Sequence, residues 1–89
     1  MAFSGLEGRV ALVTGAARGL GFAIAERLAH GGAKVLLNGR DPAALEQAAA
    51  WIEGKTEVLA FDIADDEATA AAFEQIARSG GLSILVNNV

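Results

Sequence analysis

Four short apolar runs recur along the chain at similar intervals. They are rich in β-branched and aliphatic residues and comprise Val10–Val13, Val35–Leu37, Val58–Phe61 and Ile84–Val86. Each run is too short for a helix, and its near-continuous apolarity is typical of a parallel strand that is buried on both faces. The pattern therefore predicts four strands of a parallel sheet.

Three segments with helical spacing of apolar residues separate these runs. In the first segment, Leu20, Ile24 and Leu28 fall at i, i+4 and i+8 and form one stripe, which stops at Gly31-Gly32, where a left-handed C-cap forms easily. The second segment opens with Asp41-Pro42, and the third opens with the acids of Asp65–Glu67; both are helix-start signals. We expect these inward-facing residues: Leu45, Ala48, Ala49 and Ile52 in the second helix, and Phe73, Ile76 and Ala77 in the third.

The resulting order is β-α-β-α-β-α-β. With right-handed crossovers, this order predicts an α/β fold, a partial Rossmann-like doubly wound parallel sheet in a single domain over residues 1–89. Hydrophobic residues make up 53% of the chain, and its mean hydropathy is +0.38. Small independent domains are usually more polar, so the composition indicates part of a larger core or a tight oligomer.

Composition and charge exclude several classes of function. The net charge is −4 and the seven Lys and Arg residues are scattered, which argues against a nucleic-acid partner. The absence of cysteine excludes a disulfide scaffold, a thiolate zinc site and a cysteine nucleophile. His30 has no acidic partner at ligand spacing, so we expect no metal site. No signal peptide and no membrane span are evident, so we expect no membrane partner and a cytoplasmic protein.

A glycine-rich turn, Thr14–Gly21, lies where the first predicted strand leads into the first helix. A Gly at the end of the strand permits a tight turn, a second lets the backbone approach a pyrophosphate, and a third allows close packing of the helix on the sheet. The free N–H groups of the first helical turn then favour phosphate. The segment therefore predicts nucleotide binding, with a purely structural turn as the alternative.

The spacing of this turn, Gly-x-x-x-Gly-x-Gly, resembles the short-chain dehydrogenase/reductase family, whose first turn reads Thr-Gly-x-x-x-Gly-x-Gly. Gly31–Ala33, Asp62-Ile63 and Val86–Asn88 match other family marks in order and spacing, so the resemblance covers essentially the whole chain. It implies the strand order 3-2-1-4 and a truncated NAD(P)-binding Rossmann domain that is similar to the first third of a family member. The cofactor-binding residues that it implies are Gly15, Ala17, Arg18, Gly19, Leu20, Gly21, Arg40, Asp62, Ile63 and Asn88.

The second predicted strand bears on the choice of cofactor. An acid at its end would bind a ribose hydroxyl and repel a 2′-phosphate, but the resemblance places Gly39 there. Arg40 follows directly, and Arg18 precedes the second glycine of the turn; in similar family members these two positions bind the 2′-phosphate. We therefore expect NADP rather than NAD. Two solvated surface arginines are the alternative, and Asp41, one residue past the usual position of the acid, weighs against the preference.

The resemblance also assigns roles to residues after the third and fourth strands. Asp62 is expected to accept a hydrogen bond from the adenine amino group, with Ile63 beside the ring; an N-cap for the following helix is the alternative role of Asp62. Asn88 is expected near the ribose, and Asn87 is expected to stabilise the central sheet.

The family's chemistry needs a Tyr with a Lys four residues further on, and a Ser that positions the substrate carbonyl. The chain contains no tyrosine, so we predict no catalytic residues and no activity for these 89 residues alone. They are expected to be the nicotinamide dinucleotide-binding part of an oxidoreductase that interconverts carbonyl and alcohol. A free-standing nucleotide-binding or assembly module without catalysis, or a module for another nucleotide, is the alternative. We expect a homo-oligomer or association with the remainder of its own chain.

Overall fold

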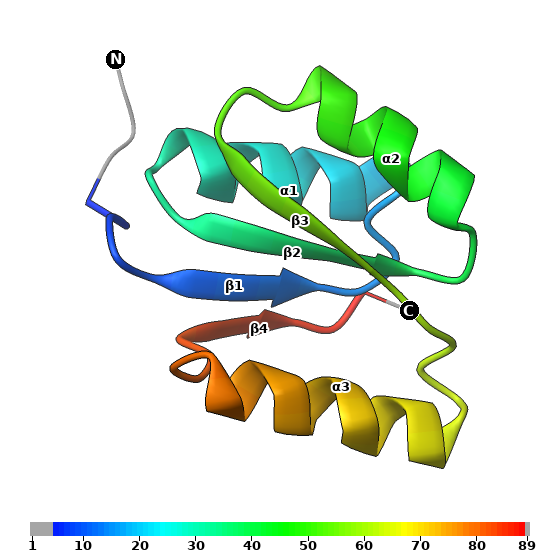
Figure 1. Ribbon diagram of the computed structural model, residues 1–89. Coiled ribbons are helices and arrows are strands. Elements are labelled where there is room, and N and C mark those ends of the chain that lie inside the picture. Colours follow the sequence, from blue (N-terminus) through cyan, green and yellow to red (C-terminus); the bar gives the residue numbers. More distant parts are fainter. Residues whose placement is uncertain (1–4, 89) are drawn as a thin grey trace.

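A four-stranded parallel sheet forms the middle layer of the molecule (Figure 1). The computed structural model describes residues 5–88. In chain order its elements are β1 (Val10–Val13), α1 (Gly19–His30), β2 (Lys34–Gly39), α2 (Pro42–Trp51), β3 (Lys55–Ala60), α3 (Asp66–Arg78) and β4 (Ile84–Val86). The strands lie in the order β3-β2-β1-β4 and all pair in parallel. The predicted fold class and strand order are therefore confirmed.

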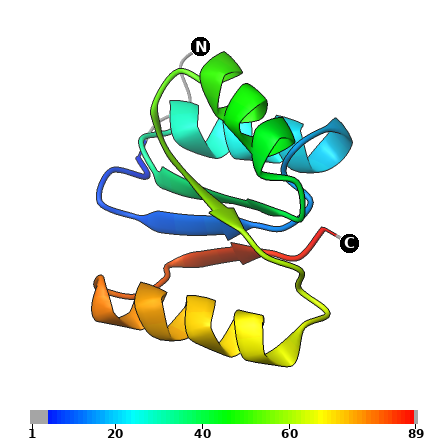
Figure 2. The same cartoon turned by 45° about the vertical axis from the view of Figure 1, so that its right-hand side comes forward.

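Helices cover both faces of the sheet. α1 and α2 lie on one face and α3 lies on the other, as the two views show (Figure 1, Figure 2). Successive side chains of a strand point to opposite faces, so Val13 and Leu37 join the core under α1 and α2 while Leu12 and Leu36 contact Ile76 of α3. The two central strands are buried on both faces, as the sequence predicts.

The two edge strands depart from that prediction. β3 alternates between exposed and half-buried residues, and Leu85 of β4 is 54% exposed. β3 also spans Lys55–Ala60 rather than Val58–Phe61, so Phe61 follows the strand. An edge strand has a neighbour on one side only, and its polar positions contact water. The Glu57 carboxylate of β3 pairs with Lys34 Nζ at 3.0 Å.

The buried faces of the helices differ in part from the expected stripes. Leu20 is 68% exposed, and the positions of α1 that lie deepest against the sheet are Gly21, Ala25 and Ala29. Small residues let the helix axis approach the sheet closely, and large apolar residues are displaced to the flank. In α3, Ala72 is buried where we expected Ala77, which is exposed.

The single tryptophan lies outside the core. Large aromatic side chains are most often buried in a core or an interface, but Trp51 is 78% exposed at the end of α2. Its helix nevertheless packs firmly, because Leu45 and Ala48 are buried against the sheet.

Candidate cofactor site

Every segment that the sequence singled out for cofactor binding lies at the carboxyl end of the sheet. Two adjoining pockets open there. The first is lined by Gly15, Ala17, Arg18, Gly39, Arg40, Asp41 and Ala44, and the second by Thr14, Gly15, Asn38, Gly39, Arg40, Phe61, Asp62, Ile63, Ala64 and Asn88. They share Gly15, Gly39 and Arg40, so together they form one groove. In doubly wound sheets, ligands bind outside the carboxyl ends of the strands, where the connections diverge to either side; here that point lies between β1 and β4.

The three glycines of the turn meet different physical demands. Gly15 and Gly19 have φ angles of 60° and 62°, a left-handed conformation that other residues adopt only with strain. A Cβ at Gly21 would lie 2.1 Å from the carbonyl oxygen of Gly15 and 2.7 Å from Nδ2 of Asn88. A Cβ at Gly19 would meet nothing within 4 Å, so that side of the backbone stays open to a ligand.

The start of α1 differs from the starts of the other two helices. The Asp41 carboxylate caps α2 by accepting hydrogen bonds from the N–H groups of Ala43 and Ala44, and Asp65 caps α3 by accepting from the N–H of Ala68. The Asp41 N-cap was predicted and is confirmed; for α3 the sequence predicted only an acidic helix start, and the structure shows that Asp65 is its N-cap. At α1 the N-cap residue is Arg18, and no side chain caps the helix. Its first N–H groups are therefore available to an anion.

The segment that follows β4 is hydrogen-bonded to the glycine turn. The N–H of Asn88 donates to Thr14 Oγ1 at 2.8 Å, and Asn88 Nδ2 donates to the Gly15 carbonyl at 3.4 Å. Thr14 Oγ1 also lies 3.3 Å from Asn87 Oδ1, and the Thr14 N–H donates to the Val86 carbonyl at 3.0 Å. These bonds join Asn87 and Asn88 to the turn.

Two arginines line the pocket beside the glycine turn. Arg18 and Arg40 are exposed, and no ion pair involves either of them among the residues that the structure describes. Gly39, the last residue of β2, precedes Arg40 and carries no side chain into the pocket. The carboxylate of Asp41 faces the N-terminus of α2, where it accepts two hydrogen bonds. The pocket is therefore open to a doubly charged anion on its arginine side.

Asp62 and Ile63 lie in the second pocket, at the end of β3. The Asp62 side chain accepts a hydrogen bond from the N–H of Ala64 at 2.9 Å, which is a local turn, while Asp65 caps α3. The alternative role of Asp62 as the N-cap is therefore wrong, and Asp62 itself is exposed in the groove.

The structure also shows where the other predicted residues lie. Ala17 is half-buried in the first pocket, Gly21 is buried beneath the turn, and Leu20 lies outside both pockets on the open side of α1. Two buried polar residues of the site were not predicted, Thr14 and Asn38, each 2% exposed. The signal for both was present: each is the polar residue that directly follows one of the predicted apolar runs.

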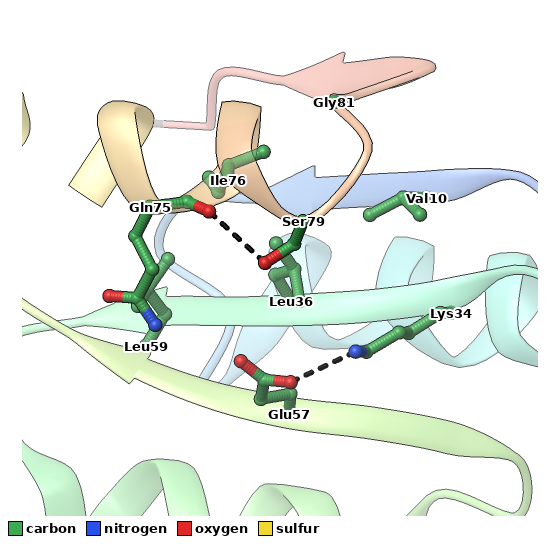
Figure 3. A pocket seen from close by; sticks show the side chains of 9 residues that line it. All are labelled: Val10, Lys34, Leu36, Glu57, Leu59, Gln75, Ile76, Ser79 and Gly81. Atoms are coloured by element: carbon green, nitrogen blue, oxygen red, sulfur yellow. Dashed lines mark hydrogen bonds and ion pairs between the residues drawn. The ribbon is translucent and has the colours of Figure 1, made fainter.

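A separate pocket lies at the opposite, amino end of the strands, between α3 and the sheet (Figure 3). Its charged residues, Lys34 and Glu57, pair with each other, and the Ser79 hydroxyl donates to the Gln75 carbonyl at 3.1 Å. None of the predicted cofactor residues lines it. Within residues 5–88, no three His, Asp or Glu side chains gather as metal ligands, and no helix is long and apolar enough to cross a membrane.

Comparison with known proteins identifies the family. The family model described as short chain dehydrogenase matches residues 9–89. The chain belongs to the short-chain dehydrogenase family. Gluconate 5-dehydrogenase of Gluconobacter oxydans is 41% identical over 87 residues, which cover 93% of this chain and 34% of that protein. The 3-oxoacyl-[acyl-carrier-protein] reductase FabG of Vibrio cholerae is 40% identical over 84 residues, which cover 93% of this chain and 34% of that protein.

Solved structures agree with this assignment. A 3-oxoacyl (acyl-carrier-protein) reductase from Agrobacterium tumefaciens, crystallised with NADP bound, superposes with a TM-score of 0.85 at 40% identity, covering 96% of this chain and 34% of that one. A hydroxysteroid dehydrogenase from Escherichia coli gives a TM-score of 0.85 at 31% identity, covering 93% of this chain and 37% of that one. The chain therefore spans about a third of the length of these short-chain dehydrogenases and corresponds to their N-terminal portion.

Proposed function

We propose that this chain is the dinucleotide-binding portion of a short-chain dehydrogenase that prefers NADP(H) over NAD(H). The observation that carries the preference is that Arg18 and Arg40 line one pocket with Gly39, where an acid would repel the 2′-phosphate. The NADP-bound reductase of A. tumefaciens supports the choice, since it is 40% identical to this chain.

The groove offers separate contacts for the two phosphate groups of such a cofactor. The uncapped first turn of α1, with Gly15 and Gly19 in left-handed conformations, would bind the pyrophosphate through backbone N–H groups. Arg18 and Arg40 would bind the 2′-phosphate, each through charge-assisted hydrogen bonds worth about 1.5–3 kcal/mol.

The remaining contacts concern the adenosine half of the cofactor. The Asp62 carboxylate would accept from the adenine amino group, with Ile63 beside the ring. Asn88 would contact the ribose, and its hydrogen bonds to Thr14 and Gly15 fix its position. The nicotinamide of the bound cofactor would supply the hydride. Leu20, which is 68% exposed at the start of α1, would lie along the cofactor.

We propose that the complete protein interconverts a carbonyl and an alcohol. By the complete protein we mean the longest natural polypeptide that carries these residues. Gluconate 5-dehydrogenase and 3-oxoacyl-[acyl-carrier-protein] reductase, both about 40% identical to this chain, support a hydride-transfer reaction of this class. The chain itself contains no tyrosine to act as the family's acid–base group, so that group would come from residues outside it.

Calorimetric titration of the complete protein with NADP⁺ and NAD⁺ tests the preference. NADP⁺ should bind at least about tenfold more tightly, because one charge-assisted contact to the 2′-phosphate is worth that much. Arg40→Asp should reverse the order, since it removes a phosphate contact and adds a repulsive carboxylate. Arg9→Asp is the matched control: Arg9 is exposed and precedes β1, at the opposite end of the sheet. Equal affinity for the two cofactors in the unmutated protein would refute the preference.

A further inference from the structure

Asn38 is a buried polar residue in the candidate groove that none of the roles above uses. It is 2% exposed near the end of β2, where it lines the second pocket. Its amide nitrogen donates to the carbonyl oxygen of Leu59 at 3.0 Å and to that of Phe61 at 3.1 Å. The side chain therefore links β2 to the end of β3 and to Phe61, the residue before Asp62.

The main chain of the same residue bonds in another direction. The carbonyl oxygen of Asn38 accepts a hydrogen bond from the N–H of Ala16, inside the glycine turn, at 2.9 Å. Asn38 thus contacts both walls of the groove, through its backbone on the phosphate side and through its side chain on the adenine side. A substitution removes only the second of these contacts, because every residue retains a backbone carbonyl.

The two carbonyl acceptors fix the orientation of the amide. Rotating it by 180° would place the Asn38 Oδ1 against the carbonyl oxygens of Leu59 and Phe61, with no hydrogen between them. The direction of the chain at Phe61 is therefore set by a specific donor. Phe61 is followed at once by Asp62, whose side chain is held in a local turn by the N–H of Ala64.

We propose that Asn38 is a positioning residue for recognition of the adenine base. It holds the end of β3 so that the Asp62 carboxylate meets the amino group of the base, and it does not itself contact the phosphates. This inference rests on the proposed function, because it takes the groove to be the cofactor site. Without the amide, the Leu59 and Phe61 carbonyls lose a donor, and the end of β3 shifts to recover hydrogen bonds with water.

The test compares two cofactors that differ only at the base. NADP⁺ and nicotinamide hypoxanthine dinucleotide phosphate carry the same phosphates, but the second has a carbonyl oxygen in place of the adenine amino group. That oxygen would face the Asp62 carboxylate without a hydrogen, so the unmutated complete protein should prefer NADP⁺ by about tenfold. Asn38→Leu, of similar size but without a donor, should bring the ratio to within about twofold, as should Asp62→Ala.

Controls separate positioning from loss of stability. Ile76→Val weakens the core on the α3 face, away from the groove, and should retain the tenfold ratio. The double variant Asn38→Leu with Asp62→Ala should lose no more discrimination than either single variant, because both act on one contact. If Asn38→Leu does not fold, Asn38→Thr, which keeps one hydroxyl donor, replaces it and should give an intermediate ratio.

The outcomes are distinct from those for the proposed function. An unchanged ratio in the Asn38 variant, or an equal loss of affinity for both cofactors, would overturn the positioning role. An unmutated protein that does not discriminate between the two bases would overturn it as well, while a preference for NADP⁺ over NAD⁺ would still support the proposed function.

Discussion

Replacing Gly21 with alanine tests the packing that shapes the glycine turn. An alanine in a helix normally gains about 1 kcal/mol over glycine. Here the added Cβ would lie 2.1 Å from the Gly15 carbonyl oxygen, and that contact must lengthen to at least 3.0 Å. The neighbour is backbone, so no side-chain rotation relieves the clash, and overpacking of this kind costs about 1–3 kcal/mol. The difference between this cost and the helix-propensity gain is a net decrease in the free energy of unfolding of up to about 2 kcal/mol for Gly21→Ala.

The same shift should disturb cofactor binding, because Gly15 and Asn88 move with the turn. Urea unfolding of the complete protein, followed by circular dichroism, measures the stability, and calorimetry should show an affinity for NADP⁺ at least about tenfold weaker. Ala23→Gly is the matched control: Ala23 is exposed on α1, so the variant should cost about 1 kcal/mol of stability and leave the affinity unchanged. A Gly21→Ala protein with full stability and unmutated affinity would show that the turn is not tightly packed.

Two further predictions concern the isolated 89-residue chain. Leu85 is 54% exposed and β4 pairs with β1 on one side only, so we expect the chain not to be a stable monomer at micromolar concentration. Size-exclusion chromatography with light scattering measures the oligomeric state. A folded monomer with protected amides along β4 would contradict the prediction. We also expect the chain not to catalyse the reduction of any carbonyl compound by NADPH, since it contains no tyrosine. The absorbance of NADPH is followed with a panel of carbonyl compounds, and saturable oxidation above the buffer control would contradict the expectation.

The central part of the fold was predictable because local patterns and packing agree there. The apolar runs Val10–Val13 and Val35–Leu37 form the centres of β1 and β2, and the Asp41 cap follows the ordinary chemistry of helix starts. The burial of α1 was not predictable from hydrophobicity alone. Spacing selected Leu20, whereas close approach to the sheet selects small residues such as Ala25, and only the packed structure shows which of the two demands decides.

For the candidate site, the sequence located the segments but not the supports between them. Glycine spacing marked the turn, and the family pattern marked Asp62 and Asn88. The hydrogen bonds from Asn38 to β3 and from Asn88 to Thr14 join residues distant in the chain. Such pairs depend on strand order and register. From a single sequence, these can be predicted only through resemblance to a known family. Residue type alone does not predict burial either, since the large aromatic side chain of Trp51 is exposed.

The bonds between the glycine turn and the Asn87-Asn88 segment have a consequence for the order in which the site forms during synthesis. Thr14 leaves the ribosome early, but its partner Asn88 is 74 residues further along the chain. At ordinary rates of translation, this interval is about 4–15 s. During this interval β4 has not yet been synthesised, so the edge of β1 that pairs with it has unpaired N–H and C=O groups, with which another strand could pair. The segment that is hydrogen-bonded to the glycine turn is therefore also the one that covers this edge of β1.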